Sequence, residues 1–361
     1  MRYLITHFNN LFIRLDEIQK FIKTIELQKR LSSEYRNSED SFSEQLNSLN
    51  DLIDLYDKLH NSMVQYNASI ISIYACFENF IDDMAKALVD FYFDNTLTFD
   101  ELPQKIQENY FIRAGDFLSK PQQFSGLNKT PTDVINIIHK NITNQRDVSL
   151  QYEFLIKHSG NLKIDKVIEL FNNLDVKDVN SKIKNNYIFK KYISENKEIK
   201  LEDVSTYLAT ATSIFFELDR VVDARNNVAH GWYEDSRISY QSILDDTIPF
   251  LQCLCRVILE EVVCFMFEYL LNHRKLQQFD NPINVFNKNI LCINSKQSVL
   301  EVGDFLFYKN ADNKYTVARI ISLKKQDVSL DKNIEPNVDI GIGLDKPVKT
   351  SYEFYYFEQD L

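Results

Sequence analysis

Residues 56–84, YDKLHNSMVQYNASIISIYACFENFIDDM, decide the fold class of this chain. Their large apolar and aromatic side chains recur at steps of three and four residues, the spacing that places side chains on one face of an α-helix. The pattern predicts a long helix within residues 51–92, with an apolar face that needs a partner. The residues of this face are Tyr56, Leu59, Met63, Tyr66, Ile70, Ile73, Phe77, Phe80 and Met84.

Three further segments carry the same helical spacing. They lie at residues 4–25, at 202–222 and at 244–273. Residues 97–200 hold shorter apolar runs interrupted by prolines, which predicts inserted accessory helices. Long helices joined in sequence favour an up-and-down bundle, so we expect a mainly α helical domain over residues 1–275. The first of the apolar faces consists of Leu4, Phe8, Leu11, Leu15, Ile18, Ile22 and Ile25.

The pattern changes near Asn281 to short runs of alternating apolar residues separated by turn residues. The runs 302–308, 315–323, 338–344 and 352–357 predict antiparallel strands. About 80 residues with this rhythm predict a small, separately folded β-barrel over residues 282–361.

Composition and charge favour a folded protein with reduced cysteines and argue against several other classes. The chain has 361 residues, 44% of them hydrophobic, which is enough for substantial cores. Its five cysteines lie in apolar contexts without a CxxC pair and predict reduced core residues of a cytoplasmic protein. We expect neither a signal peptide nor a membrane span. A net charge of -11 argues against a protein that coats nucleic acid without specificity.

The run RNNVAHG at residues 225–231 contains the chemistry-bearing residues. The guanidinium of Arg225 fits a phosphate, and the imidazole of His230 can transfer a proton near neutral pH. In an alternative reading, Arg225 pairs with Asp223 or Glu234 on a solvated face, and His230 ends a helix beside a glycine.

This run resembles the R-x4-H motif of the HEPN superfamily, in which Asn, Asp or His usually follows the arginine. Asn226 fits that preference. The resemblance implies an all-helical domain in which two copies form one metal-independent ribonuclease site across a dimer. It also implies Arg225, Asn226 and His230 as catalytic residues, and a role in toxin or anti-phage systems.

Two segments resemble the RNA-ligase-associated HEPN branch. The stretch YACFENF at residues 74–80 is similar to its first core helix, which often carries an acidic residue in an aromatic frame; this implies that Glu78 orients Arg225 or His230. The alternative is a solvent-facing glutamate beside the apolar face. The stretch HSGNLK at residues 158–163 is similar to an inserted segment, which makes His158 and Asn161 candidates for RNA binding. A plain helix cap is the alternative there.

Residues 177–200 combine lysines with aromatic residues, a mixture suited to phosphates and stacked bases. A solvated amphipathic helix is the alternative reading. The candidates for RNA binding in this segment are Lys182, Lys184, Lys190, Lys191 and Tyr187.

Other sites have no support in the sequence. We find no Walker loop, GxGxxG or HExxH, and the six histidines lack metal-ligand spacing. We therefore predict no metal and no cofactor. A serine or cysteine nucleophile stays open, because such triads assemble from distant residues.

These observations predict an endoribonuclease that cuts RNA by attack of the ribose 2′-OH. One histidine cannot easily serve as base and acid, so a homodimer is expected. The C-terminal pieces 302–304 and 340–348 resemble the second-domain barrel of translation factors, which implies binding of RNA or of a regulatory protein. The alternative function is a non-catalytic module that binds RNA or protein and uses the motif as a phosphate grip.

Overall fold

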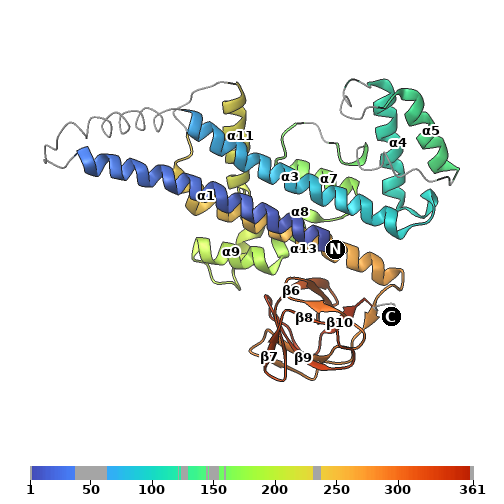
Figure 1. Ribbon diagram of the computed structural model, residues 1–361. Helices are drawn as coiled ribbons and strands as arrows, with labels where there is room; N and C mark the ends of the chain where they lie inside the picture. The colour runs from blue at the N-terminus through green and yellow to red at the C-terminus, as the bar shows by residue number, and fades with distance from the viewer. Residues whose placement is uncertain are drawn as a thin grey trace.

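Three long helices form the centre of the molecule. The computed structural model describes residues 2–36, 63–120, 122, 129–143, 145, 154–157, 160–230 and 237–357. Helices α1 (Arg2–Arg36), α3 (Met63–Asn95) and α13 (Ile248–Asn272) pack against one another as nearly parallel rods (Figure 1). The predicted apolar faces of α1 and α3 are buried between them, which confirms the helical spacing. Tyr56 and Leu59 lie outside the described residues.

Most residues of the third helix are apolar, and most of the helix is buried. It begins after α12 (Tyr240–Ser242) and a single π-turn, η5 (Ile243–Thr247). It ends at Asn272, as the pattern over residues 244–273 predicted. Because α13 contacts helices on one side and the sheet on the other, it joins the two parts of the chain.

Short helices cover the remaining faces of the bundle. Prolines punctuate them as predicted: α4 starts directly after Pro103, and Pro131 opens α5 behind a capping box of Thr130 and Asp133. Of the helices in the described residues, none combines the length and apolar character needed to cross a membrane. The short helices are η2 (Phe99–Glu101), α4 (Gln104–Ser119), α5 (Pro131–Ile142), α7 (Ile164–Asn173), α8 (Val179–Asn185) and α9 (Tyr187–Lys197).

The apolar spacing at residues 202–222 predicted one continuous helix leading into the motif, and this prediction is wrong. The chain forms α10 (Val204–Thr210) and then, after a break, α11 (Phe216–His230). Ala211 adopts extended backbone with ψ of 129°, and the hydroxyl of Thr210 donates to the carbonyl oxygen of Thr206 at 3.3 Å. The following Thr212 and Ser213 are poor helix formers, since their hydroxyls compete for backbone groups. Helix α11 therefore takes its own direction across the end of α3.

The C-terminal strands form a curled antiparallel sheet rather than the closed barrel that we expected. Its order is β1-β10-β5-β6-β9-β3-β2, with β7 beside β6. The long strand β6 pairs with β5 through its first half and with β9 through its second, and the register shifts between Ile320 and Ser322. That irregularity bends the sheet, but β1 and β2 end the order without pairing to each other. The strands of this sheet are β1 (Gln277–Gln278), β2 (Asn284–Phe286), β3 (Ile290–Asn294), β5 (Phe305–Lys309), β6 (Tyr315–Lys325), β7 (Val328–Leu330), β9 (Asp339–Leu344) and β10 (Glu353–Tyr356); β4 (Leu300–Glu301) pairs with β8 (Lys332–Asn333) apart from it.

The sheet shares a core with the helices. Phe307, Val317 and Tyr355 belong to the same apolar cluster as the helical bundle, and the ring of Phe307 stacks on that of Phe267 at 4.9 Å. A second cluster fills the curl of the sheet. A domain boundary between residues 275 and 282 stays a prediction, and the shared core ties the stability of the sheet to that of α13.

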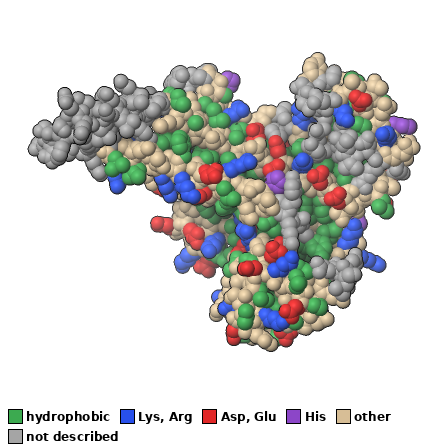
Figure 2. Space-filling view, viewed as in Figure 1, with side chains coloured by type: hydrophobic (Ala, Val, Ile, Leu, Met, Phe, Trp, Pro, Cys, Tyr) green, Lys and Arg blue, Asp and Glu red, His purple; other side chains and the backbone are tan. Residues whose placement is uncertain are grey.

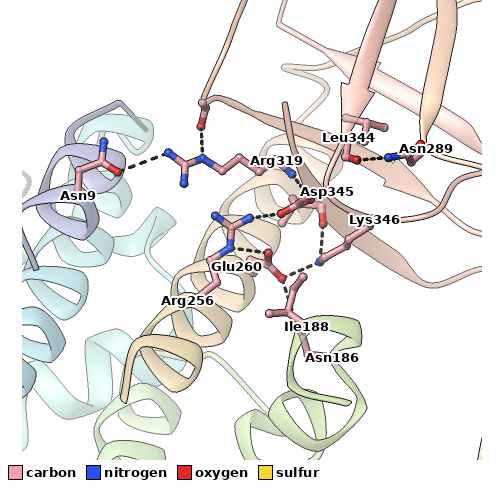
Figure 3. A network of polar contacts seen from close by, with 12 residues as sticks. Asn9, Asn186, Ile188, Arg256, Glu260, Asn289, Arg319, Leu344, Asp345 and Lys346 are labelled. Atoms are coloured by element: carbon pink, nitrogen blue, oxygen red, sulfur yellow. Dashed lines mark hydrogen bonds and ion pairs between the residues drawn. The ribbon is translucent and has the colours of Figure 1, made fainter. Parts of the chain in front are cut away.

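A buried ionic network fixes the sheet on α13 (Figure 3). Glu260 is 1% exposed, and its Oε2 accepts a hydrogen bond from Nζ of Lys346 at 2.6 Å. Its Oε1 accepts from Arg256, which also donates to Asp345 at 2.6 Å. Asn186, between α8 and α9, donates to the same carboxylate at 2.9 Å. One carboxylate therefore connects α13, the α8–α9 junction and the sheet.

Candidate functional site

The three motif residues lie in the second half of α11. Leu218, Val221 and Val222 bury one face of this helix, and α3 is its main packing partner. Arg225 and Asn226 are half-buried, whereas His230 is exposed. The chain is α-helical through His230, and Gly231 lies outside the described residues.

Helical geometry separates the arginine from the histidine. Five positions correspond to about 140° around the helix axis, so Arg225 and His230 point to different sides of α11. Asn226 and His230 are four positions apart and lie on one face. A single copy of the motif therefore presents His230 beside Asn226, with Arg225 turned toward α3.

Arg225 is held by two neighbours. Its guanidinium lies over the ring of Tyr74, with 5.4 Å between Cζ and the ring centroid. Its Nη1 is 3.5 Å from Oδ1 of Asn226, and the same oxygen accepts a hydrogen bond from Nδ2 of Asn161 at 2.6 Å. Asn161, which the sequence predicted as an RNA-binding residue, thus contacts the motif across 65 positions of chain.

Glu78 reaches the motif through Tyr74. The hydroxyl of Tyr74 donates to Oε1 of Glu78 at 3.0 Å and accepts from the backbone N–H of Leu162 at 3.0 Å. Burial raises the pKa of Tyr74 to about 12, and the charge of Glu78 adds to the rise. The phenol consequently stays protonated at neutral pH. Glu78 positions the ring under Arg225, in place of the direct contact with Arg225 or His230 that we expected.

Asp223 pairs with a residue other than Arg225. Its Oδ1 lies 2.8 Å from Nζ of Lys163, directly before α7. The alternative interpretation expected an ion pair between Arg225 and Asp223, but Asp223 pairs with Lys163 instead. Its other expected partner for Arg225, Glu234, lies outside the described residues. Two contacts, Lys163 with Asp223 and Asn161 with Asn226, clamp the segment before α7 onto α11.

The sequence profile of the RiboL-PSP-HEPN family matches residues 9–263. The chain belongs to this family. The match runs from α1 into α13 and includes the motif, so the HEPN resemblance is confirmed. The comparison with curated proteins gives no match. Membership indicates a ribonuclease-like or RNA-binding function. The curled sheet lies beyond the matched residues.

The basic candidates of this HEPN chain lie away from the motif. Lys182 and Tyr187 line a cleft between α8, α9, α13 and the sheet. Lys184 faces α10, and Lys191 is exposed beside Glu195 at 3.9 Å. Lys190 is half-buried on α9, and His158 lies outside the described residues.

The HEPN site includes residues that sequence reasoning missed. Tyr74 lies under Arg225, and Lys163 pairs with Asp223 on the same helix as the motif; neither was a predicted site residue. Tyr74 stands four positions before Glu78, a spacing that places both on one helix face and that could have identified the pair. Among the described residues, no three His, Cys, Asp or Glu side chains gather as a metal site requires.

We expect Tyr74→Phe to lower the free energy of unfolding by about 1–3 kcal/mol, because it leaves the buried N–H of Leu162 without its acceptor. Denaturant unfolding measures the change. Tyr187→Phe is the matched control, since the hydroxyl of Tyr187 makes no hydrogen bond to a described residue; its effect should stay within about 0.5 kcal/mol. Equal effects of the two substitutions would contradict the role of the Tyr74 hydroxyl.

Proposed function

We propose that this HEPN chain is a metal-independent endoribonuclease. The observation that carries the proposal is the arrangement on α11, where Arg225 and Asn226 are held by Tyr74 and Asn161 while His230 is exposed one helical turn after Asn226. Residues that bind a phosphate are thus fixed before a substrate arrives, and the residue that transfers a proton is open to it. Such preorganisation is what catalysis by positioning and electrostatics requires.

The proposed reaction is an internal transesterification. The ribose 2′-oxygen attacks the adjacent phosphorus while its proton passes to a base, and the bond from phosphorus to the 5′-oxygen breaks as that oxygen takes up a proton. His230 acts as one of the two proton-transfer groups. Arg225 stabilises the charge that develops on the phosphoryl oxygens, and Asn226 holds the phosphate or the hydroxyl in place. The products are a 2′,3′-cyclic phosphate and a 5′-hydroxyl.

A second copy of the chain supplies the missing half of this site. The reaction needs both a base and an acid, and one motif offers one histidine. Arg225 and His230 of one copy also point to different sides of α11, so two facing motifs bring together what one helix separates. If the two facing motifs play unequal roles, so that one histidine and one arginine suffice, mixing His230→Ala with Arg225→Ala chains should restore cleavage in part of the mixed dimers. An active species that light scattering identifies as a monomer would contradict the shared site.

Cleavage should persist in excess EDTA, because every proposed catalytic group is a side chain. Purified protein is incubated with RNA with and without EDTA, and the rate of RNA loss is compared. His230→Ala protein purified in the same way controls for contaminating nucleases. Activity that disappears on chelation and returns with added magnesium would indicate a different chemistry.

The remaining parts of the proposal concern context. We infer a cytoplasmic toxin or anti-phage effector from the HEPN resemblance, with the curled sheet recruiting RNA or a regulatory protein. The sheet's likeness to translation-factor second domains supports that role. The second candidate function is a non-catalytic module that binds RNA or protein and grips phosphate through Arg225, whose guanidinium is already held in place. RNA binding without any cleavage would favour it.

A further inference from the structure

A cleft of about 550 Å³ separates α8 and α9 from the sheet, with α13 at its base. This volume is typical of a site for a small molecule. Lys182 and Tyr187 line one wall, Glu261 lies on the base, and Lys314 and Tyr315 line the opposite wall. The cleft is separate from the motif on α11, none of whose residues line it.

The wall formed by the sheet is held in a fixed shape. Oδ1 of Asn310 accepts hydrogen bonds from the backbone N–H groups of Asp312 and Lys314, both at 3.0 Å. The backbone N–H of Asn310 donates to the carbonyl oxygen of Lys314 at 2.9 Å. Asn313 takes a left-handed φ of 59°, which asparagine tolerates better than most residues. The turn between β5 and β6 thus presents Lys314 to the cleft at a fixed position.

Lys182 and Lys314 line this cleft together with the carboxylates of Glu261 and Glu268, and Lys190 lies near Lys314. Among the described residues, no carboxylate lies within 4 Å of Nζ of Lys182, Lys190 or Lys314. Partial burial lowers the pKa of Lys190, and the nearby charge of Lys314 lowers it further.

Three other lysines of the C-terminal strands are paired with glutamates. Lys309, Lys325 and Lys332 each lie within 4.0 Å of a glutamate oxygen, and on the face in Figure 2 basic and acidic side chains are interspersed. In a chain with a net charge of -11, Lys182 and Lys314, which line the cleft without an ion-pair partner among the described residues, favour an anionic ligand.

The cleft also offers an aromatic face and a hydrogen-bond acceptor. The half-buried ring of Tyr187 lines the cleft and stacks on no aromatic ring of a described residue. Oε1 of Glu261 accepts from Asn186 at 3.0 Å, while its Oε2 makes no hydrogen bond to a described residue. Burial raises the pKa of Glu261, so a ligand N–H that donated to the carboxylate would offset part of the cost of its charge. Phosphate alone uses neither feature.

We propose that this cleft binds a ribonucleotide, with its phosphate at Lys182 and Lys314, its base against Tyr187 and a base N–H donated to Glu261. Lysine ammonium groups bind phosphate, aromatic rings stack on bases, and carboxylates accept from base amino groups. The choice of a ribonucleotide rests on the proposed function. The same chemistry is offered by a free nucleotide and by one nucleotide of an RNA strand.

Binding to the full-length chain tests this site without any cleavage. Calorimetry measures 5′-AMP, 5′-GMP and inorganic phosphate, and fluorescence anisotropy measures a 2′-O-methylated RNA of about ten nucleotides, which resists 2′-OH attack. The test variant is Lys182→Ala/Lys314→Ala. The control, Lys197→Ala/Lys324→Ala, removes the same charge from exposed positions of α9 and β6 outside the cleft. Circular dichroism checks folding, and Tyr187→Ala replaces the test variant if the latter unfolds.

We expect the test variant to bind a nucleotide or the RNA about 30-fold more weakly than the control variant, which should match the unchanged chain within about twofold. Loss of mononucleotide binding identifies a free nucleotide as the source, and loss of RNA binding alone identifies a strand. Equal affinity of the test and control variants would overturn the proposal. So would phosphate binding as tight as nucleotide binding, or no binding of any probe.

The proposed nucleotide site in the cleft and the proposed ribonuclease activity can be refuted independently. His230→Ala should leave binding in the cleft unchanged, because the cleft and α11 share no residue. Binding in the cleft without RNA cleavage by the unchanged chain would refute the proposed function alone. If cleavage depends on His230 but the Lys182→Ala/Lys314→Ala variant binds nucleotide and RNA as tightly as the unchanged chain, only the proposed nucleotide site is refuted.

Discussion

His230→Ala is expected to lower the rate of RNA cleavage by about three orders of magnitude, the scale of a lost proton-transfer group. The imidazole is exposed at the end of α11, so its removal should change the free energy of unfolding by no more than about 0.5 kcal/mol. Initial rates on a short unstructured RNA and denaturant unfolding give the two numbers. A large loss of activity without a loss of stability separates a catalytic role from a structural one.

Matched variants sharpen this expectation. His139→Ala removes an exposed histidine from the last turn of α5 and should leave the rate unchanged. Arg225→Lys keeps the charge but loses the planar fork, and should still cost much of the activity. Full activity of His230→Ala would show that the motif on α11 is not the site of proton transfer.

Glu260→Ala should destabilise the protein by about 3–5 kcal/mol, the usual result of removing one partner from a buried ion pair. The substitution leaves Lys346, which is 3% exposed, and Arg256 without their shared carboxylate. Denaturant unfolding measures the loss. Glu335→Ala is the control, because its pair with Lys325 is exposed and should contribute less than about 1 kcal/mol. Similar losses in the two variants would contradict the importance of burial.

The same network predicts a pH dependence. Burial raises the pKa of Glu260, but Lys346 and Arg256 outweigh it and hold the pKa below the ordinary 4.5. A carboxylate with a lowered folded-state pKa stabilises the fold above its unfolded pKa and loses that contribution as pH falls through the folded pKa. The stability difference between the unchanged chain and Glu260→Gln should therefore shrink as pH falls below 4.5. A difference independent of pH would show that Glu260 is not ionised in the fold.

The spacing of apolar residues predicted the helices and strands of this fold better than it predicted whether the sheet closes into a barrel. The apolar faces of α1 and α3 follow from spacing alone, since side chains three and four positions apart share a helix face. The break at Ala211 was missed because apolar spacing continues through it, while competition from Thr210, Thr212 and Ser213 is a local backbone effect. The strands were located, but closure of a barrel depends on the pairing of its edges, which the sequence pattern does not contain.

The sequence predicted the motif residues of the candidate site, but it did not predict most of the residues that contact them. Arg225, Asn226 and His230 lie within six consecutive residues, so their common helix could be read directly. The contacts that hold them join distant positions: Asn161 is 65 residues from Asn226, and Tyr74 comes from another helix. Long-range contacts of this kind depend on how the helices pack, and Asn161 was found only through a resemblance.

The ends of the RNA fragments test the central claim most directly. The protein is incubated with a defined RNA in EDTA, and mass spectrometry identifies the new ends, with a substrate that carries a 2′-deoxyribose at the cut position as control. Attack by the 2′-oxygen predicts a 2′,3′-cyclic phosphate and a 5′-hydroxyl, with no cleavage at the deoxyribose and none by His230→Ala. New 5′-phosphate ends, or cleavage at the deoxyribose, would contradict it.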